Sequence, residues 1–198
     1  MLPWDVLSSK PLVSRPPWLR LWEEDVRLPN GEVIAGYLRS QSRDYAAVFA
    51  LMEDGTVPLV SQYKHGKGAV SLDLPAGYLD TVDESPLTAA RRELEEETGV
   101  TAAAWQSMGG LVVDSNRGNT RCHLFLAKGA VRDGSQHLDT TEDLTVSFHR
   151  LSELLHLVIS GRIDSIGSVA GILLALRLLD GDEECPSVGA SSSSGGLS

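Results

Sequence analysis

Glutamates are crowded into one short segment, Arg92–Val100, where four of the nine residues are acidic. On a helix, Glu93 and Glu97 lie one turn apart on the same side, and Glu96 lies further round that side. Like charges at this spacing destabilise a helix, so a positive group is expected beside them. Carboxylate oxygens on a rigid helix suit Mg²⁺ or Mn²⁺. The segment therefore predicts a divalent-cation site.

The charge alone leaves a second interpretation open. A glutamate-rich helix is commonly a solvated face that keeps a protein soluble. The residues around the glutamates, rather than their number, favour the metal site.

A helix with clear ends is expected to carry these carboxylates. Ser85 is a good N-cap, Pro86 suits the first helical position, and Gly99 is typical of the residue after the last turn. An apolar stripe must face the core, and Arg91 and Glu95 point to solvent. The stripe consists of Leu87, Ala90 and Leu94.

Many short strand-like runs surround this helix. Pro29-Asn30-Gly31 between residues 18–28 and 32–40 predicts a hairpin, and residues 45–52 and 56–64 read as a second one. Further strands are expected near residues 69–77, 105–114, 121–129 and 143–151. Two helices, separated by Gly161, close the domain. The order predicts an α+β fold with a mixed sheet.

Composition limits the classes of partner. With 198 residues, a single ordinary domain is expected. The formal net charge of −10 argues against a sequence-independent nucleic-acid binder, but a bound cation would allow a phosphate-bearing substrate. Two cysteines make no disulfide framework, and no signal peptide or membrane span is legible. We expect a cytoplasmic protein that binds neither nucleic acid nor membrane.

Four regions are expected along the chain. Residues 1–17 are Pro-rich and predicted to be irregular, and residues 18–44 form an N-terminal strand extension. Residues 45–180 form the main domain. Residues 181–198 are rich in Ser and Gly and are expected to be disordered.

The helix segment resembles the Nudix hydrolase signature, G-x5-E-x7-R-E-U-x-E-E-x-G-U, where U is aliphatic. Residues 92–100, RELEEETGV, match its second half at every specified position, and seven residues separate Glu84 from Arg92 as required. The one departure is that six residues, rather than five, separate Gly77 from Glu84. The resemblance implies a mixed β-sheet sandwiched between helices.

Weaker motifs resemble the ADP-ribose pyrophosphatase branch of that superfamily, over roughly residues 18–180. They are Leu74-Pro75-Ala76-Gly77, Gln62-Tyr63-Lys64 and Gly161-Arg162-Ile163-Asp164-Ser165. The branch implies Mg²⁺-dependent cleavage of ADP-ribose, or a related nucleoside diphosphate sugar, to a nucleoside monophosphate and a sugar phosphate. Mn²⁺ is the alternative metal.

By this resemblance, Glu93, Glu96, Glu97 and the backbone carbonyl of Ala76 are metal ligands. Arg92 orients Glu96, with which it can pair at i, i+4. Glu84 is an outer-sphere support.

The general base in this branch comes from a glutamate on a loop after the helix, and Glu142 is the candidate here. Asp139 and Asp143 compete for the role, and a plain solvated loop acid is the alternative. Arg117 and Arg121, in the Gly/Asn-rich loop 112–123, are candidates to contact phosphate or ribose, although that loop also reads as an ordinary hairpin.

For several other residues the sequence gives a less specific signal. Tyr63 and Lys64 are expected to contact substrate, and His65 is either a phosphate contact or a turn residue. Cys122 reads as a small core residue. The tryptophans of the N-terminal region are expected to pack in the core or at a dimer interface more than to stack on adenine. They are Trp4, Trp18 and Trp22.

Strand exchange between subunits is common in the branch, so a homodimer is expected. Two other functions stay open. One is hydrolysis of another nucleoside diphosphate derivative: a dinucleotide, a GDP-sugar or a nucleoside triphosphate. The other is a Nudix-fold module that binds a metabolite without cleaving it. Such modules usually lose the signature glutamates, so the retention of Glu93, Glu96 and Glu97 favours an enzyme.

Overall fold

The computed structural model describes residues 1–81, 83–138, 140 and 143–181. Within these ranges the chain forms three β-sheets and three α-helices. The predicted fold class, an α+β domain with a mixed sheet, is confirmed. None of the described helices is long and apolar enough to cross a membrane.

The central sheet has the strand order β7-β4-β9-β8. Strand β4 runs parallel to β9 and antiparallel to β7, which makes the sheet mixed. The four strands are β4 (Tyr45–Met52), β7 (Ala76–Tyr78), β8 (Thr101–Val112) and β9 (Arg121–Val131).

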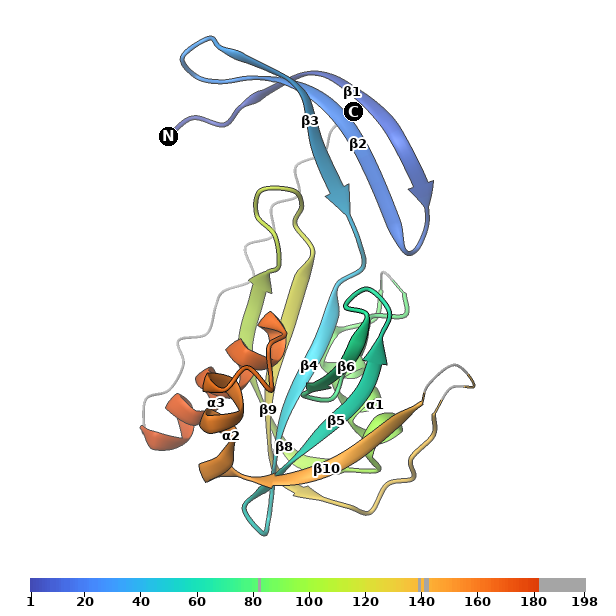
Figure 1. Ribbon diagram of the computed structural model, residues 1–198, viewed down its shortest axis with the longest axis vertical. Coiled ribbons are helices and arrows are strands. Elements are labelled where there is room, and N and C mark those ends of the chain that lie inside the picture. Colours follow the sequence, from blue (N-terminus) through green and yellow to red (C-terminus); the bar gives the residue numbers. More distant parts are fainter. Residues whose placement is uncertain (82, 139, 141–142, 182–198) are drawn as a thin grey trace.

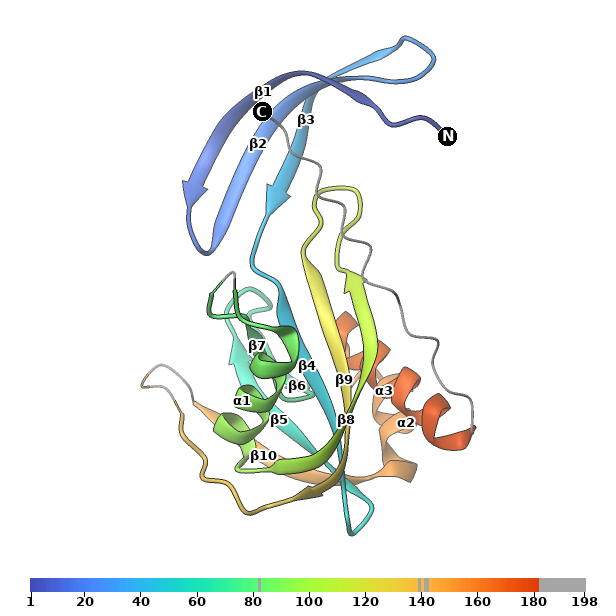
Figure 2. The ribbon, with the colours of Figure 1, turned by 180° about the vertical axis from the view of Figure 1, so that it is seen from behind.

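Helices cover both faces of this sheet (Figures 1 and 2). Alternate residues of β4 point to opposite sides, as strand geometry requires. Val48 packs in the cluster that includes α1, and Phe49 packs in the cluster that includes α2 and α3; both are fully buried. The helices are α1 (Pro86–Thr98), α2 (Leu151–Ile159) and α3 (Ile166–Asp180).

Strands β4 and β5 do not form the hairpin that the sequence predicted. After a turn at Asp54 and Gly55, strand β5 enters a second sheet of order β10-β5-β6 instead of pairing with β4. Strand β4 is a nearly continuous apolar run and β5 contains another at residues 57–60, so each can be buried in a sheet of its own. The second sheet contains β5 (Thr56–Lys64), β6 (Ala69–Asp73) and β10 (Leu144–Arg150).

A separate three-stranded sheet stands at one end of the molecule (Figure 1). The hairpin predicted around Asn30-Gly31 is confirmed, because β2 and β3 pair on either side of it. The expectation of an irregular segment over residues 1–17 is wrong for residues 5–15, which pair with β2. Pro11 is tolerated because β1 is an edge strand with a bulge after this residue. The strands are β1 (Asp5–Arg15), β2 (Leu19–Arg27) and β3 (Val33–Gln41).

The loop between β8 and β9 holds this N-terminal sheet against the rest of the chain. The Ser40 amide donates to the Arg117 carbonyl at 2.6 Å, and the Ser42 amide donates to Thr120 Oγ1 at 3.2 Å. A Cβ atom on Gly118 would lie 2.5 Å from the Ser40 carbonyl oxygen, so this approach requires glycine. The sequence predicts disorder for residues 181–198. Residues 182–198 lie outside the described ranges, so this stays a prediction.

Candidate active site

Helix α1 has the ends that the sequence predicts. The Ser85 hydroxyl accepts a hydrogen bond from the Thr88 amide at 3.1 Å, and Pro86 is the first helical residue. Gly99 has a φ of 67°, in the left-handed region, and its amide donates to the Glu95 carbonyl at 2.8 Å. These caps fix the register in which the helix presents its carboxylates.

The burial of the helix separates two kinds of glutamate. Ala90 and Leu94 are fully buried, as predicted, and Arg91 and Glu95 are exposed. Glu93 and Glu97 are only 8% and 4% exposed, although both are acidic. A carboxylate is costly to bury without polar or charged neighbours, so the surroundings of this pair define the site.

Strand β7 supplies one wall around the buried pair. The Ala76 amide donates to Glu97 Oε2 at 2.9 Å. A Cβ atom on Gly77 would lie 2.0 Å from Glu93 Oε1, so the Glu93 carboxylate fills the space that a side chain would need. The Pro-Ala-Gly turn is thus shaped to the two glutamates.

Arg92 is the positive group beside the glutamates. Its Nη1 donates to Glu93 Oε1 at 2.7 Å and to Glu96 Oε2 at 3.1 Å. Its Nε donates to Glu84 Oε1 at 3.2 Å, and Nη2 donates to the Tyr78 carbonyl at 3.0 Å. One guanidinium therefore joins three carboxylates and the backbone at the end of β7.

The ion pair between Arg92 and Glu84 shifts the pKa of both side chains. Burial raises the pKa of Glu84, but hydrogen bonds from Arg92 and from the Asp80 amide outweigh it and hold the pKa below its ordinary value. Burial lowers the pKa of Arg92, but hydrogen bonds to Glu84 and the charge of Glu93 raise it above its ordinary value. Both groups are therefore charged at neutral pH.

The loop between Gly77 and Glu84 adds contacts that sequence reasoning missed. The Asp80 amide donates to Glu84 Oε2 at 2.6 Å, and the Asp80 carboxylate lies 3.5 Å from Arg92 Nε. No spacing rule identified Asp80, because it lies in the loop that is one residue longer than the signature. The longer loop still brings Glu84 to Arg92.

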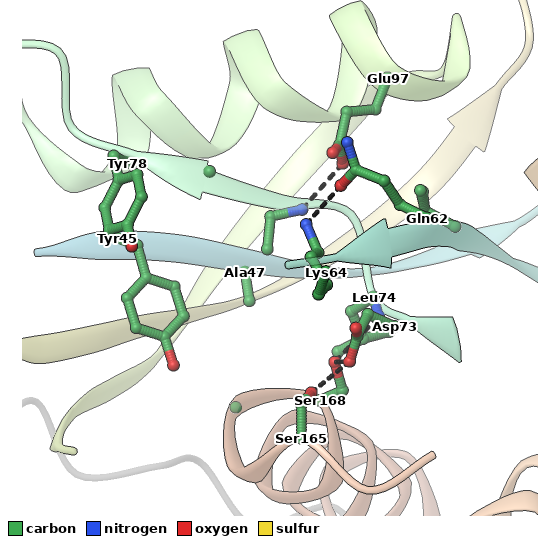
Figure 3. Close-up of a pocket in the computed structure, with 14 residues that line it drawn as sticks. Tyr45, Ala47, Gln62, Lys64, Asp73, Leu74, Tyr78, Glu97, Ser165 and Ser168 are labelled. Carbon is green, nitrogen blue, oxygen red and sulfur yellow. Dashed lines mark hydrogen bonds between the residues drawn. The ribbon is translucent and has the colours of Figure 1, made fainter. Parts of the chain in front are cut away.

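A pocket of about 260 Å³ opens beside Glu97 (Figure 3). Lys64 and Gln62 lie together on one side of it, and the Lys64 ammonium donates to the Gln62 side-chain oxygen. Tyr63, between them on β5, points to the other side of the strand and is 55% exposed. Of the two residues predicted to contact substrate here, Lys64 lines this pocket and Tyr63 does not.

The opposite wall of the pocket comes from Asp73 and Ser168, which the sequence did not single out, and from Ser165 at the end of the motif 161–165. Asp73 accepts hydrogen bonds from the hydroxyls of Ser165 and Ser168, the latter at 2.9 Å. Ser168 Oγ also accepts from the Leu74 amide at 3.0 Å. This network fixes the start of α3 against the turn before β7, and Tyr45 closes the pocket beside it. The motif at residues 161–165 pointed to this region, but its partner Asp73 is distant in sequence.

The remaining predicted residues lie elsewhere. Arg121 lines a second pocket, Arg117 lines another one against β3, and neither residue lines the pocket beside Glu97. Glu142 and Asp139 lie outside the described residues, and Asp143 is exposed directly before β10. The metal-ligand and base assignments therefore stay predictions.

The donor set is of the type that a hard divalent cation needs, because Glu93, Glu96 and Glu97 offer carboxylate oxygens on one helix beside a strand backbone. In the described ranges, no three His, Cys, Asp or Glu side chains are grouped closely enough to enclose a metal ion. Arg92 pairs with Glu93 and Glu96 in this arrangement. The chemical type of these ligands therefore fits such an ion. Of the three glutamates, Glu97 lines the pocket.

Comparison with known families agrees with this geometry. Residues 41–165 match the family described as NUDIX domain. The chain belongs to the Nudix hydrolase family. Residues 4–37 match a second family, described as nucleoside diphosphate sugar hydrolase N-terminal domain, which coincides with the separate β1–β3 sheet.

Two curated relatives of this chain are both named ADP-ribose pyrophosphatase. The chain is 30% identical over 154 residues to an ADP-ribose pyrophosphatase of Mycobacterium tuberculosis, covering 77% of this Nudix chain and 74% of the relative. It is 31% identical over 144 residues to an ADP-ribose pyrophosphatase of Bacillus subtilis, covering 72% and 77%. A solved structure of an ADP compounds hydrolase superposes with a TM-score of 0.79 over 93% of this chain and 98% of the other. At 22% identity that likeness shows the fold, and the expected Nudix fold is confirmed.

Gly77→Ala tests the fit between β7 and Glu93. The added methyl would overlap the Glu93 carboxylate, so the variant should lose about 1–3 kcal/mol of unfolding free energy, as overpacked sites typically do. Chemical denaturation measures this loss. Gly66→Ala is the matched control, because a Cβ there meets nothing within 4 Å. Equal stability of both variants would show that Glu93 moves aside freely.

Proposed function

We propose that this Nudix protein hydrolyses the diphosphate of ADP-ribose, or of a related nucleoside diphosphate sugar. The products from ADP-ribose are AMP and ribose 5-phosphate. The observation that carries the proposal is the buried pair Glu93 and Glu97, packed against Gly77 and Ala76 at the edge of a pocket that also contains Lys64. The names of the two relatives support the choice of ADP-ribose over other diphosphates.

Glu93, Glu96, Glu97 and the Ala76 carbonyl would hold Mg²⁺, with Mn²⁺ as the alternative. When bound there, the ion would neutralise charge on the diphosphate and would lower the pKa of the attacking water. The protein's own net charge of −10 opposes an anionic substrate, so such a cation is needed for binding as well as for chemistry.

The chain's own residues orient the reactants. Lys64 places a positive charge in the pocket, and its hydrogen bond to Gln62 limits where the ammonium can point. Arg92 holds Glu96 and Glu84 in fixed positions through its ion pairs. We keep Tyr63, Arg117 and Arg121 as further candidates for substrate contact, although none of them lines the pocket beside Glu97.

Glu142 is the proposed general base. In the reaction, the oxygen of water forms a bond to one phosphorus, the bond from that phosphorus to the bridging oxygen breaks, and the proton of water passes to the base. The supporting argument is position in the chain, since Glu142 directly precedes the β10 region after the carboxylate helix. Asp139 and Asp143 stay as competitors.

A homodimer completes the proposal. The β1–β3 sheet carries several exposed apolar side chains, among them Trp4, Val6, Trp18 and Val33. A lone sheet of three strands lacks a second layer to cover such a surface, and a second copy would supply one. We place the enzyme in the cytoplasm, because its two cysteines do not make a disulfide framework.

Glu97→Gln tests the proposed reaction. The change keeps the shape of the side chain and removes one charge, so kcat for ADP-ribose with Mg²⁺ should fall by at least about a hundredfold. EDTA should abolish the wild-type rate. Glu95→Gln is the control, because Glu95 is exposed on the same helix. A loss under threefold in Glu97→Gln, or full turnover in EDTA, would refute the metal assignment. No release of AMP by the wild type would refute the reaction.

Glu142→Gln tests the base. A base acts in the transition state, so kcat should fall strongly while the Kd for substrate stays nearly constant. Rapid-quench kinetics and equilibrium binding measure the two quantities. Wild-type kcat would remove Glu142 from the mechanism, and Asp143→Asn and Asp139→Asn would then identify the competitor. Parallel losses in kcat and binding would make Glu142 a ligand instead.

Light scattering coupled to size-exclusion chromatography tests the dimer. The full chain should elute with twice the mass of one copy. Val6→Lys, which places a charge at a side chain that is 59% exposed, should shift the population towards monomer without loss of thermal stability in the main domain. A monomeric wild type at micromolar concentration would contradict the proposal.

A further inference from the structure

A larger pocket, of about 510 Å³, lies where the N-terminal sheet meets the catalytic domain. Four separate segments line it: the turn between β1 and β2 with the start of β2, the connection from β3 to β4, the loop after β7, and the end of the β8–β9 loop. The charged residues that line it are Arg20, Arg43, Asp44, Asp80 and Arg121.

This second pocket adjoins the one beside Glu97. Tyr45 and Tyr78 line the first pocket, and their chain neighbours Asp44 and Leu79 line the second. The Tyr78 ring stands at the boundary, since it lines the first pocket and contacts Arg43 of the second. A ligand whose diphosphate lies at Glu93 and Glu97 can therefore extend past Tyr78 into the second pocket.

The second pocket has a small excess of positive charge, with three arginines against two aspartates, in a protein that is strongly acidic overall. Three arginines line it, and none of them forms an ion pair with a described residue. Of its two acids, Asp44 is engaged by His123 at 3.1 Å and by the Arg121 amide at 2.9 Å. Asp80 lies 3.5 Å from Arg92 of the neighbouring cluster. Arg121 Nη1 is already used, because it donates to the Gly110 carbonyl at 2.8 Å. Arg20 and Arg43 are therefore the arginines whose guanidinium groups a ligand in this pocket can engage.

Arg43 is held by rings rather than by acids. Its guanidinium carbon lies 4.9 Å from the Trp18 ring centre and 4.8 Å from the Tyr78 ring centre. Its Nε is buried and has no hydrogen-bond partner among the described residues. Because one face of each ring is already covered by Arg43, that face cannot stack on a nucleobase, and the pocket offers charge in its place.

We propose that this pocket binds a phosphate monoester that the substrate carries in addition to its diphosphate. The inference rests on the proposed function and deepens it: the favoured substrates are nucleoside diphosphate sugars with a further phosphate on the nucleoside ribose. Arginine suits this role because its planar donors bind phosphate in pairs. A free phosphate ion has the same chemistry and is the competing source of the ligand.

Calorimetry with non-hydrolysable mononucleotides tests the pocket independently of turnover. The probes are AMP, adenosine 2′,5′-bisphosphate and adenosine 3′,5′-bisphosphate, because none contains the diphosphate bond. At least one bisphosphate should bind at least about tenfold more tightly than AMP, as expected for one added charge-assisted contact. Equal Kd values for all three probes would overturn the proposal.

Arginine substitutions test whether the preference for a bisphosphate arises in the second pocket. Arg20→Gln and Arg43→Gln should each reduce the preference for the bisphosphate to less than threefold. Arg27→Gln, also exposed on β2 but outside the pocket, should keep the full preference. Arg20 is exposed, so its loss leaves folding intact even where Arg43→Gln disturbs the two rings. A preference that survives both substitutions would refute the assignment to this pocket.

Two further measurements separate the alternatives. Inorganic phosphate that binds as tightly as the bisphosphate would make the ligand a free ion and refute a substrate-borne phosphate. Hydrolysis of 2′-phospho-ADP-ribose and ADP-ribose, compared by kcat/KM, then tests the link to catalysis. Cleavage of neither compound, together with tight bisphosphate binding, would refute the proposed function and leave the pocket standing.

Discussion

The site depends on a single guanidinium. Glu93 and Glu97 are buried on one side of α1, and their like charges would oppose both the helix and its packing if nothing compensated them. Arg92 pairs with Glu93, Glu96 and Glu84 and also holds the Tyr78 carbonyl. The same residue that neutralises the cluster therefore ties the loop before the helix to the helix itself. Removing it would leave buried carboxylates with less compensating charge and a loop with fewer anchors.

Close backbone packing is the second constraint, and it follows from the first. Carboxylates can stay buried at the sheet only if the strand beside them leaves room and offers donors. Gly77 leaves the room that Glu93 fills, and the Ala76 amide donates to Glu97. On the far side of the same turn, Asp73 binds Ser165 and Ser168 at the start of α3. The short segment 73–77 thus joins helices on both faces of the sheet, which is why the pocket lies where it does.

Local patterns in the sequence were sufficient for the helix and its carboxylates. Ser85, Pro86 and Gly99 act within a few residues, and the alternation of buried and exposed positions on α1 follows from helical periodicity alone. The pairing of strands was harder to predict. Strand β4 and residues 57–60 of β5 are continuous apolar runs, so the sequence contains no alternation there to show that the two strands belong to different sheets. Contacts such as Asp73 with Ser168 join residues far apart in the chain, and no local signal announces them.

The N-terminal sheet is more than an addition to the catalytic domain. Its connection to β4 and the turn between β1 and β2 form half of the arginine-lined pocket, while the loop after β7 and the β8–β9 loop form the other half. The two halves are in direct contact, because β3 approaches the β8–β9 loop so closely that a Cβ atom on Gly118 would overlap the Ser40 carbonyl. An acidic protein can bind a highly anionic ligand only where positive charge is concentrated. Here the fold concentrates it at the boundary between its two parts, beside the carboxylates that would hold the cation.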